Sequence, residues 1–263
     1  MHNFFCTTSL HARPETLDQG RLWAQAIGAT FIERQNKPLA DMFRELAVDA
    51  LLIYTATGPE IQTNQGKHKF QLSMAELRIQ QLRKGGSDHF LRALQATGPL
   101  SLLDCTCGFG SDSIVASFGL PPGSTVAGLE SSPYLYAVTS WGLQHFVHER
   151  DDVTAALRRI TLRHGDYVDF LQAAAAPEYD ILYFDPMFAH PIMESPQFMP
   201  VRSLMNHEVL TLDHIDQACT KARKRVVIKG RAFKDIVRAF PDVRLYGGKY
   251  SRVGYAVLEC SRG

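Results

Sequence analysis

The sequence predicts an α/β fold in which helices cover both faces of a doubly wound sheet, with a small α/β subdomain in front of it. Residues 101–130 read as a strand, a glycine loop, a helix and a second strand that ends in an acid, which is half of such a sheet. Residues 179–184 form a continuous apolar run typical of a buried parallel strand. Helix and strand patterns alternate along much of the remaining chain, as they do in proteins with parallel sheets.

Length and composition are those of a globular protein. The 263 residues suffice for one large domain or for a domain with a smaller one attached, and 45% are hydrophobic while 21% are charged. No apolar run approaches the roughly 18 residues of a membrane span. Residues 1–15 lack the basic start and the long apolar core of a signal peptide. We therefore expect a cytoplasmic protein that has no membrane partner.

The cysteines and histidines do not suggest a metal site or a disulfide framework. The five cysteines are scattered and odd in number, and the pair Cys105 and Cys107 has no second Cys or His pair at zinc spacing. Small thiols suit a tight buried turn. His145 and His148 lie three positions apart without a third ligand nearby, so we interpret them as helix-surface residues. We expect no metal.

The small subdomain is expected to comprise residues 1–97, and the main domain residues 98–263. The first part alternates short helix and strand signals without a glycine-loop fingerprint. A polar segment, 60–72, follows a Gly-Pro turn and can pair back as a hairpin. The expected strands are 4–6, 30–33 and 50–54, and the expected helices are 13–27, 39–46, 74–84 and 88–96.

A glycine loop follows the first strand of the main domain. The apolar residues 102–103 bring a buried strand to Asp104, and Gly108 and Gly110 let the backbone approach a ligand closely because they carry no Cβ. An ordinary tight turn between strand and helix is the alternative. The loop lacks the third glycine of a dinucleotide fingerprint and the Lys-Ser/Thr pair of a P-loop, so neither of those sites fits.

The residues after the loop extend the expected ligand site. Ser111 or Asp112 can cap the helix that follows. Glu130 ends the second strand, where an acid can accept hydrogen bonds from both hydroxyls of a ribose. The order D-x-x-x-G-x-G followed by a strand-end acid is similar to the S-adenosylmethionine loop of class I methyltransferases.

Strand and helix signals continue in alternation after Glu130. Asp166 follows the third expected strand and can cap a helix. The tetrad Asp185-Pro-Met-Phe188 follows the fourth strand, whose carboxyl end should point at the glycine loop. A long loop, 189–207, comes next. The expected strands are 160–163, 179–184, 225–229, 243–246 and 255–259, and the expected helices are 133–148, 211–221 and 232–239.

With these motifs in view, the chain resembles the RsmJ-type family of 16S rRNA guanine-N2 methyltransferases. The segments LLDCTCGFGSDS, GLESSP, RHGDYVDFL, YDILYFDPMF and KRVVIKG follow the order of that family, and TTS, RPE and FIERQ near the N-terminus resemble one branch of it. The resemblance implies a Rossmann-like class I methyltransferase fold with a seven-stranded mixed sheet. It also implies S-adenosyl-L-methionine as the cofactor and S-adenosyl-L-homocysteine as its product.

The resemblance also implies a set of cofactor-binding residues. In that set, Asp166 and Tyr167 face the adenine. Many relatives have Arg in place of Ser111 and Pro in place of Ala189, so the exact nucleotide, more than the chemistry, stays open. Together with the loop residues, the candidates for cofactor binding are Asp104, Gly108, Gly110, Ser111, Asp112, Glu130, Ser131, Asp166, Tyr167 and Asp185.

Three residues of the tetrad are expected to carry methyl transfer. Asp185 and the carbonyl of Pro186 can accept the N–H bonds of a guanine amine and help localise its lone pair toward the methyl group. Phe188 can stack on the base, or it can be a core aromatic beneath the following loop. Amino-group methyltransferases generally carry D/N-P-P-Y/F, and Met187 here replaces the second Pro.

Positive charge is concentrated near the C-terminus although the net charge is only +1. Residues 221–252 carry eleven Lys and Arg against two Asp, so this stretch has a charge of +9. It is either a set of solvated basic faces or a phosphate-binding surface. On the second interpretation, the residues that contact RNA include Lys224, Arg225, Lys229, Arg231 and Lys249.

Three functions are open at this point. The chain can be an rRNA guanine-N2 methyltransferase that acts on ribosomal RNA or the small ribosomal subunit. It can be a methyltransferase of another RNA, a small molecule or a protein, or a cofactor-binding module without catalysis. The tetrad beside the basic stretch favours the first function over the second. Glu130 and Asp185 are both intact, which argues against the third.

Overall fold

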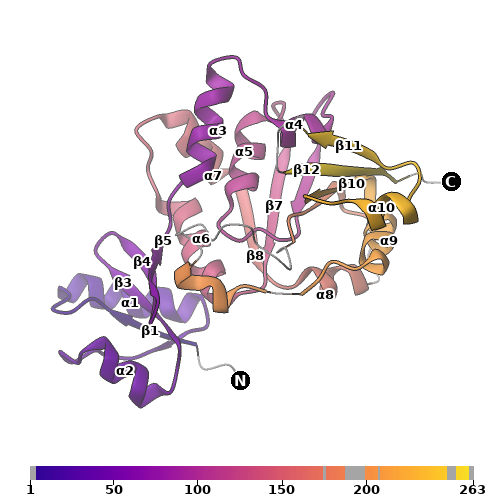
Figure 1. The fold of residues 1–263 in the computed structure, drawn as a ribbon. Coiled ribbons are helices and arrows are strands. Elements are labelled where there is room, and N and C mark those ends of the chain that lie inside the picture. The colour runs from indigo at the N-terminus through magenta and orange to yellow at the C-terminus, as the bar shows by residue number, and fades with distance from the viewer. Residues whose placement is uncertain (1–3, 174–175, 187–198, 207, 248–252, 261–263) are drawn as a thin grey trace. The chain divides into compact units, whose positions relative to one another are not determined.

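The structure is a computed structural model that describes residues 4–173, 176–186, 199–206, 208–247 and 253–260. It contains two compact units, whose elements are labelled in Figure 1. Within that described part of the chain, no helix has both the length and the apolar character needed to cross a membrane. Unit 1 comprises the described residues within Met1–Gln71, Ser132–Phe146 and Pro191–Met205, and unit 2 comprises those within Leu72–Ser131, Val147–His190 and Asn206–Gly263.

This division does not follow a single boundary near residue 97. Helices α3 (Ser73–Arg83) and α4 (His89–Leu94) precede that point in the sequence but lie in unit 2. Helix α6 (Pro133–His145) follows it but lies in unit 1, where the Tyr134 hydroxyl donates a hydrogen bond to the Ala50 carbonyl at 3.1 Å. Contacts between segments that are distant in the sequence set the division.

Unit 2 is built on a seven-stranded mixed sheet, as expected. Its strand order is β11-β12-β10-β9-β6-β7-β8. Strands β6 to β10 run parallel, and β12 pairs antiparallel with both β10 and β11. The strands are β6 Ser101–Asp104, β7 Thr125–Glu130, β8 Ile160–His164, β9 Tyr179–Phe184, β10 Ala222–Gly230, β11 Arg244–Gly247 and β12 Gly254–Glu259.

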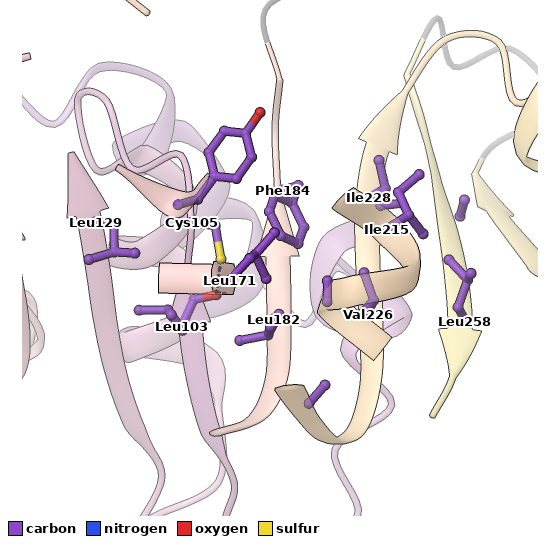
Figure 2. Packing of buried hydrophobic residues seen from close by; sticks show 14 of the residues in the cluster. Leu103, Cys105, Leu129, Leu171, Leu182, Phe184, Ile215, Val226, Ile228 and Leu258 are labelled. Atoms are coloured by element: carbon purple, nitrogen blue, oxygen red, sulfur yellow. Dashed lines mark hydrogen bonds between the residues drawn. The ribbon is translucent and has the colours of Figure 1, made fainter. Parts of the chain in front are cut away.

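Helices cover both faces of this sheet (Figure 1). On one face, Leu103, Leu182 and Val226 follow one another across the sheet, with Ile215 of α9 beside them, in the buried cluster of Figure 2. On the other face, the Phe90 ring of α4 lies 4.5 Å from the ring of Tyr183 in β9. Besides α3 and α4, the helices of unit 2 are α5 Ser111–Gly119, α7 Asp151–Arg158, α8 Tyr167–Gln172, α9 Leu212–Lys221 and α10 Lys234–Ala239.

Two elements were not among those expected from the sequence. Helix α7 is only eight residues long and begins with two acids, yet it buries Val153, Ala156 and Leu157. These three buried positions span too few residues to predict a helix by themselves. Part of the expected loop 189–207 forms the 3₁₀ helix η1 (Met199–Leu204).

Unit 1 contains a five-stranded sheet of order β2-β1-β3-β4-β5. Met42 of α2 packs with Leu51 and Ile53 of β3 in a small buried cluster. The expected hairpin within 60–72 is present, because β4 and β5 pair antiparallel with Ile61 opposite His68. The elements besides α6 and η1 are β1 Phe5–Thr8, α1 Pro14–Ala26, β2 Thr30–Phe31, α2 Leu39–Leu46, β3 Ala50–Thr55, β4 Gly58–Thr63 and β5 Gly66–Lys69.

Candidate active site

The polar residues of the candidate site lie at the carboxyl ends of the parallel strands of unit 2. Asp104 ends β6, Glu130 ends β7, and Asp166 and Asp185 follow β8 and β9. Lys229 lies next to the end of β10. Because β6 pairs in parallel with both β7 and β9, these ends meet at one edge of the sheet. This edge contains the switch point at which open α/β sheets bind their ligands.

Asp104 shapes the glycine loop from within unit 2. Its side chain is almost fully buried, and it accepts hydrogen bonds from the Ser113 hydroxyl at 2.7 Å and from the Thr106 amide at 3.1 Å. Burial raises the pKa of Asp104 to about 7, although the hydrogen bond from Ser113 acts in the opposite direction. The described contacts of Asp104 therefore fix the conformation of the loop.

Gly110, and not Ser111 or Asp112, is the N-cap of α5. Its φ of 76° lies in the left-handed region, which glycine adopts without strain, and no side chain caps the helix. Ser111 and Asp112 lie in the first turn. The predicted cap is wrong because tertiary contacts hold the Asp112 carboxylate elsewhere.

Glu130 joins the end of β7 to the glycine loop. Its side chain is 6% exposed, and one of its oxygens accepts a hydrogen bond from the Gly108 amide at 2.7 Å. Gly108 itself has φ 55°, and a Cβ placed there would meet nothing nearer than the Thr106 carbonyl at 4.0 Å. At Gly108 the backbone of the loop therefore borders open space, next to the buried carboxylate of Glu130. The neighbouring Ser131 carbonyl lies 3.1 Å from His164 Nε2.

Asp166 caps α8, as predicted, and Tyr167 packs below it. The Asp166 carboxylate accepts hydrogen bonds from the Val168 amide at 2.9 Å and from the Asn206 side chain at 2.8 Å. The Tyr167 ring is 5% exposed and meets the ring of Phe184 edge-on at 5.5 Å. Its buried hydroxyl has no hydrogen-bond partner within the described segments. Asn206 is a site neighbour that the sequence did not indicate.

Asp112 lies at the centre of a buried ion cluster. Arg78 Nη1 lies 2.5 Å from one oxygen, and Lys229 Nζ and the Tyr183 hydroxyl lie 3.0 Å and 2.8 Å from the other. Burial alone would raise the pKa of Asp112, but the charges of Lys229 and Arg78 hold it well below its usual range. Arg78 and Tyr183 come from α3 and β9, and no local motif in the sequence pointed to them.

Asp185 faces the same cluster from the end of β9. Its amide donates a hydrogen bond to the Thr106 hydroxyl at 2.7 Å, which joins the start of the tetrad to the glycine loop. One of its carboxylate oxygens lies 2.7 Å from Lys229 Nζ. The structure therefore brings Asp185 next to the loop, where the sequence placed it. Met187, Phe188 and Ala189 lie outside the described residues.

Two of the residues predicted to contact RNA make specific contacts within unit 2. Lys224 Nζ lies 3.4 Å from Asp180 Oδ1. The Arg225 guanidinium donates hydrogen bonds to the carbonyls of Leu94 and Gln95 at 2.9 Å and 3.4 Å, at the end of α4. A positive charge at this place compensates the carbonyl end of the helix. Both residues thus have partners within unit 2, and their contact with RNA stays a prediction.

The remaining predicted RNA contacts differ in their surroundings. Lys229 lies in the ion cluster and its side chain is 21% exposed. Arg231 is exposed, directly after β10. Lys249 lies outside the described residues. In the segments that the structure describes, no group of three or more His, Cys, Asp and Glu side chains is placed to hold a metal ion.

The strand order and the glycine loop define a class I methyltransferase that uses S-adenosylmethionine. The site fits this cofactor, because a buried acid ends the second strand and the loop beside it offers bare backbone. The chain belongs to the family described as "Putative SAM-dependent methyltransferase", whose model matches residues 51–251. The resemblance seen in the sequence motifs is thereby confirmed.

Similar proteins agree with this assignment. The chain is 29% identical over 224 residues to "Uncharacterized protein YpiP" of Bacillus subtilis (strain 168), over 85% of this chain and 87% of that one. It is 34% identical over 160 residues to "Ribosomal RNA small subunit methyltransferase J" of Rhodopseudomonas palustris (strain BisB5), over 56% of this chain and 68% of that one. The protein of the same name from Bdellovibrio bacteriovorus is 31% identical, over 56% of each chain.

A solved structure shares the whole fold. The SAM-dependent methyltransferase NGO1261 from Neisseria gonorrhoeae superimposes with a TM-score of 0.65, over 97% of this chain and 95% of that one. The sequence identity is 19%, so this likeness concerns the fold.

Proposed function

We propose that the protein transfers a methyl group from S-adenosylmethionine to the exocyclic N2 amine of a guanine in 16S rRNA, in the cytoplasm. The observation that carries the proposal is the position of Asp185, an acceptor carboxylate at the end of β9 that is tied to the glycine loop through Thr106. The relatives named ribosomal RNA small subunit methyltransferase J, with 31% and 34% identity, support ribosomal RNA as the substrate class.

Methyl transfer requires the protein to position the amine and the cofactor more than it requires a strong base. The cofactor supplies a methyl group on a positively charged sulfur, already activated for in-line displacement. A guanine amine is a poor nucleophile because its lone pair is delocalised into the ring. Asp185 and the carbonyl of Pro186 accept its N–H bonds and localise that pair toward the methyl group. In this proposal Phe188 stacks on the target base.

In this proposal the cofactor residues have the roles that the family resemblance implies. Glu130 accepts hydrogen bonds from the ribose hydroxyls, and the loop at Gly108 and Gly110 faces the methionine end of the cofactor. Asp166 and Tyr167 border the adenine. In this proposal the exposed Arg231 contacts RNA phosphates, and so does Lys249, which lies outside the described residues. Lys224, with its side chain 51% exposed, can exchange its partner Asp180 for a phosphate.

Mapping of modified nucleotides by mass spectrometry tests the proposal. Small-subunit rRNA from a strain that lacks the gene should lose one N2-methylguanosine. Wild-type protein should restore the mark to that rRNA or to isolated subunits, and Asp185→Ala should not. The exposed Glu149→Ala serves as a matched control and should act as wild type. An unchanged set of N2-methylguanosines in the deletion strain would exclude this substrate and leave another RNA, a small molecule or a protein.

A further inference from the structure

Lys229 lies between two carboxylates at the end of β10. Its ammonium is 2.7 Å from Asp185 Oδ2 and 3.0 Å from Asp112 Oδ2. Burial would lower the pKa of Lys229, but the two carboxylates outweigh that effect and raise it. The ammonium therefore stays charged over the pH range in which the protein folds.

The two carboxylates differ in what else they contact. Asp112 has an 8% exposed side chain, and Arg78 and Tyr183 also donate to it. Asp185 has a 28% exposed side chain, and among the described residues Lys229 is the donor to its carboxylate. Asp112 therefore anchors the ammonium, while Asp185 keeps one oxygen for another donor.

The protonation state of Asp185 depends on Lys229. Burial raises the pKa of Asp185, the ammonium of Lys229 lowers it, and the nearby negative charge of Asp112 raises it again, so that the pKa lies above its usual value. Loss of the ammonium would raise the pKa further. A protonated carboxyl would then face the substrate amine with a donor in place of an acceptor.

We propose that Lys229 is a positioning residue for methyl transfer: its ammonium, anchored on Asp112, keeps Asp185 ionised and turned so that its second oxygen accepts the N–H of the substrate amine. This inference rests on the proposed transfer to a nucleobase amine. It gives Lys229 a different role from a phosphate contact, although both roles need a positive charge at the end of β10.

Other charged and titratable groups surround the pair. They are Arg78 of α3, Asp104 of β6, Asp112 of α5, Tyr183 of β9 and Tyr255 of β12. Burial raises the pKa of both tyrosines, so they stay neutral. Arg78 stays charged between Asp88 and Asp112. Asp104, with a pKa of about 7, is the neighbour that can titrate together with Asp185.

The pH dependence of single-turnover methyl transfer, at saturating cofactor, tests the role of Lys229. In Lys229→Met the acid limb should move up by about one pH unit, so the rate below it should fall about tenfold. Lys229→Arg should restore most of the rate. If Lys229→Met does not fold, Lys229→Gln, which keeps a donor for Asp112, carries the same test. An unmoved acid limb in a folded variant would overturn the proposal.

Two further measurements separate the possible roles. A phosphate contact predicts that Lys229→Met flattens the salt dependence of RNA affinity by about one unit, whereas a positioning role leaves that slope unchanged. Carbon-13 NMR can measure the titration midpoint of the Asp185 carboxyl without RNA. The variant Asp185→Asn assigns its signal, and Asp104→Asn removes the titration of the neighbouring carboxyl. A higher Asp185 midpoint in Lys229→Met supports the inference even if the rRNA substrate is wrong, and an unchanged midpoint rejects it.

Discussion

The ends of β7 and β9 hold their acids in different ways. At the end of β7, Glu130 accepts a hydrogen bond from the Gly108 amide, a donor without net charge that comes from the loop just before α5. At the end of β9, Asp185 is paired with the ammonium of Lys229, which is shared with Asp112. The described donor to Glu130 is thus a backbone amide from the nearby loop, and the described donor to Asp185 is a charged group on a different strand.

The difference fits the role that we propose for each end. An acid that binds ribose hydroxyls has neutral donors as its partners, and a short motif suffices to place it. An acid that meets a poorly nucleophilic amine must stay ionised in a partly dehydrated site, and a positive charge nearby achieves this. The cluster of Arg78, Asp112 and Lys229 supplies that charge at the cost of burying ions, which is stable only while all partners are present.

Among the variants considered, loss of Asp112, which anchors the ion cluster beside the end of β9, should reduce the stability of the protein most. We expect Asp112→Ala to lower the free energy of unfolding by about 3 kcal/mol, the lower end of the range for breaking a buried ion pair, because Arg78 keeps Asp88 and Lys229 keeps Asp185. Urea denaturation measures the change. The matched control is Asp152→Ala, which removes an exposed acid paired with Arg83 and should leave stability nearly unchanged. Equal stabilities of the two variants would contradict the importance of the cluster.

Glu130→Ala tests the β7 side. The variant should weaken S-adenosylmethionine and S-adenosylhomocysteine binding by about 1–3 kcal/mol, because hydrogen bonds to a charged group are lost. Isothermal titration calorimetry measures the affinity, with Glu149→Ala as an exposed control. The variant should remain folded, because the described donor to Glu130 is a neutral backbone amide. Full cofactor affinity in Glu130→Ala would remove this residue from the site.

Asp104 lies on β6, between the two sides, and its effect should depend on pH. Its folded pKa of about 7 exceeds the unfolded value of about 3.9, so the folded state holds a proton that the unfolded state releases between these values. This contribution to stability is present below about pH 4 and is lost as the pH rises through about 7.

The variant Asp104→Asn removes that titration. The difference in unfolding free energy between wild type and Asp104→Asn should change with a slope of up to about 1.4 kcal/mol per pH unit across this window. Denaturation at a series of pH values gives the slope. Parallel pH profiles for the two proteins would show that Asp104 keeps an ordinary pKa despite its burial.

Local signals were sufficient for much of the fold. The helix expected at 39–46 begins and ends where α2 does, and the seven-stranded sheet was expected from strand patterns and the family resemblance. Asp166 was predicted as an N-cap and accepts the hydrogen bond that defines one. The helix, the cap and each single strand depend on residues within a few positions of each other, so a pattern in the sequence contains them.

Local signals failed where distant segments compete for a side chain. Asp112 has the right residue type and place for a helix cap, but Arg78 and Lys229 hold its carboxylate and Gly110 takes the cap position. The sequence suggests that Arg225 is a surface charge, but its guanidinium donates a hydrogen bond to the Leu94 carbonyl at the end of α4. The ion pairs are stronger in a low-dielectric interior than a cap at the surface, so the tertiary contacts prevail.

The glycine loop and the strand-end acids Glu130 and Asp185 could be predicted from short runs of residues, and the fold class from the alternation of elements along the chain. The position of α3 in unit 2, the contact of Arg78 with Asp112 and that of Lys229 with Asp185 became visible only in the folded chain. These two ion pairs join residues that are 34 and 44 positions apart. Folding brings them within hydrogen-bond distance because burying each charge is favourable only beside its opposite.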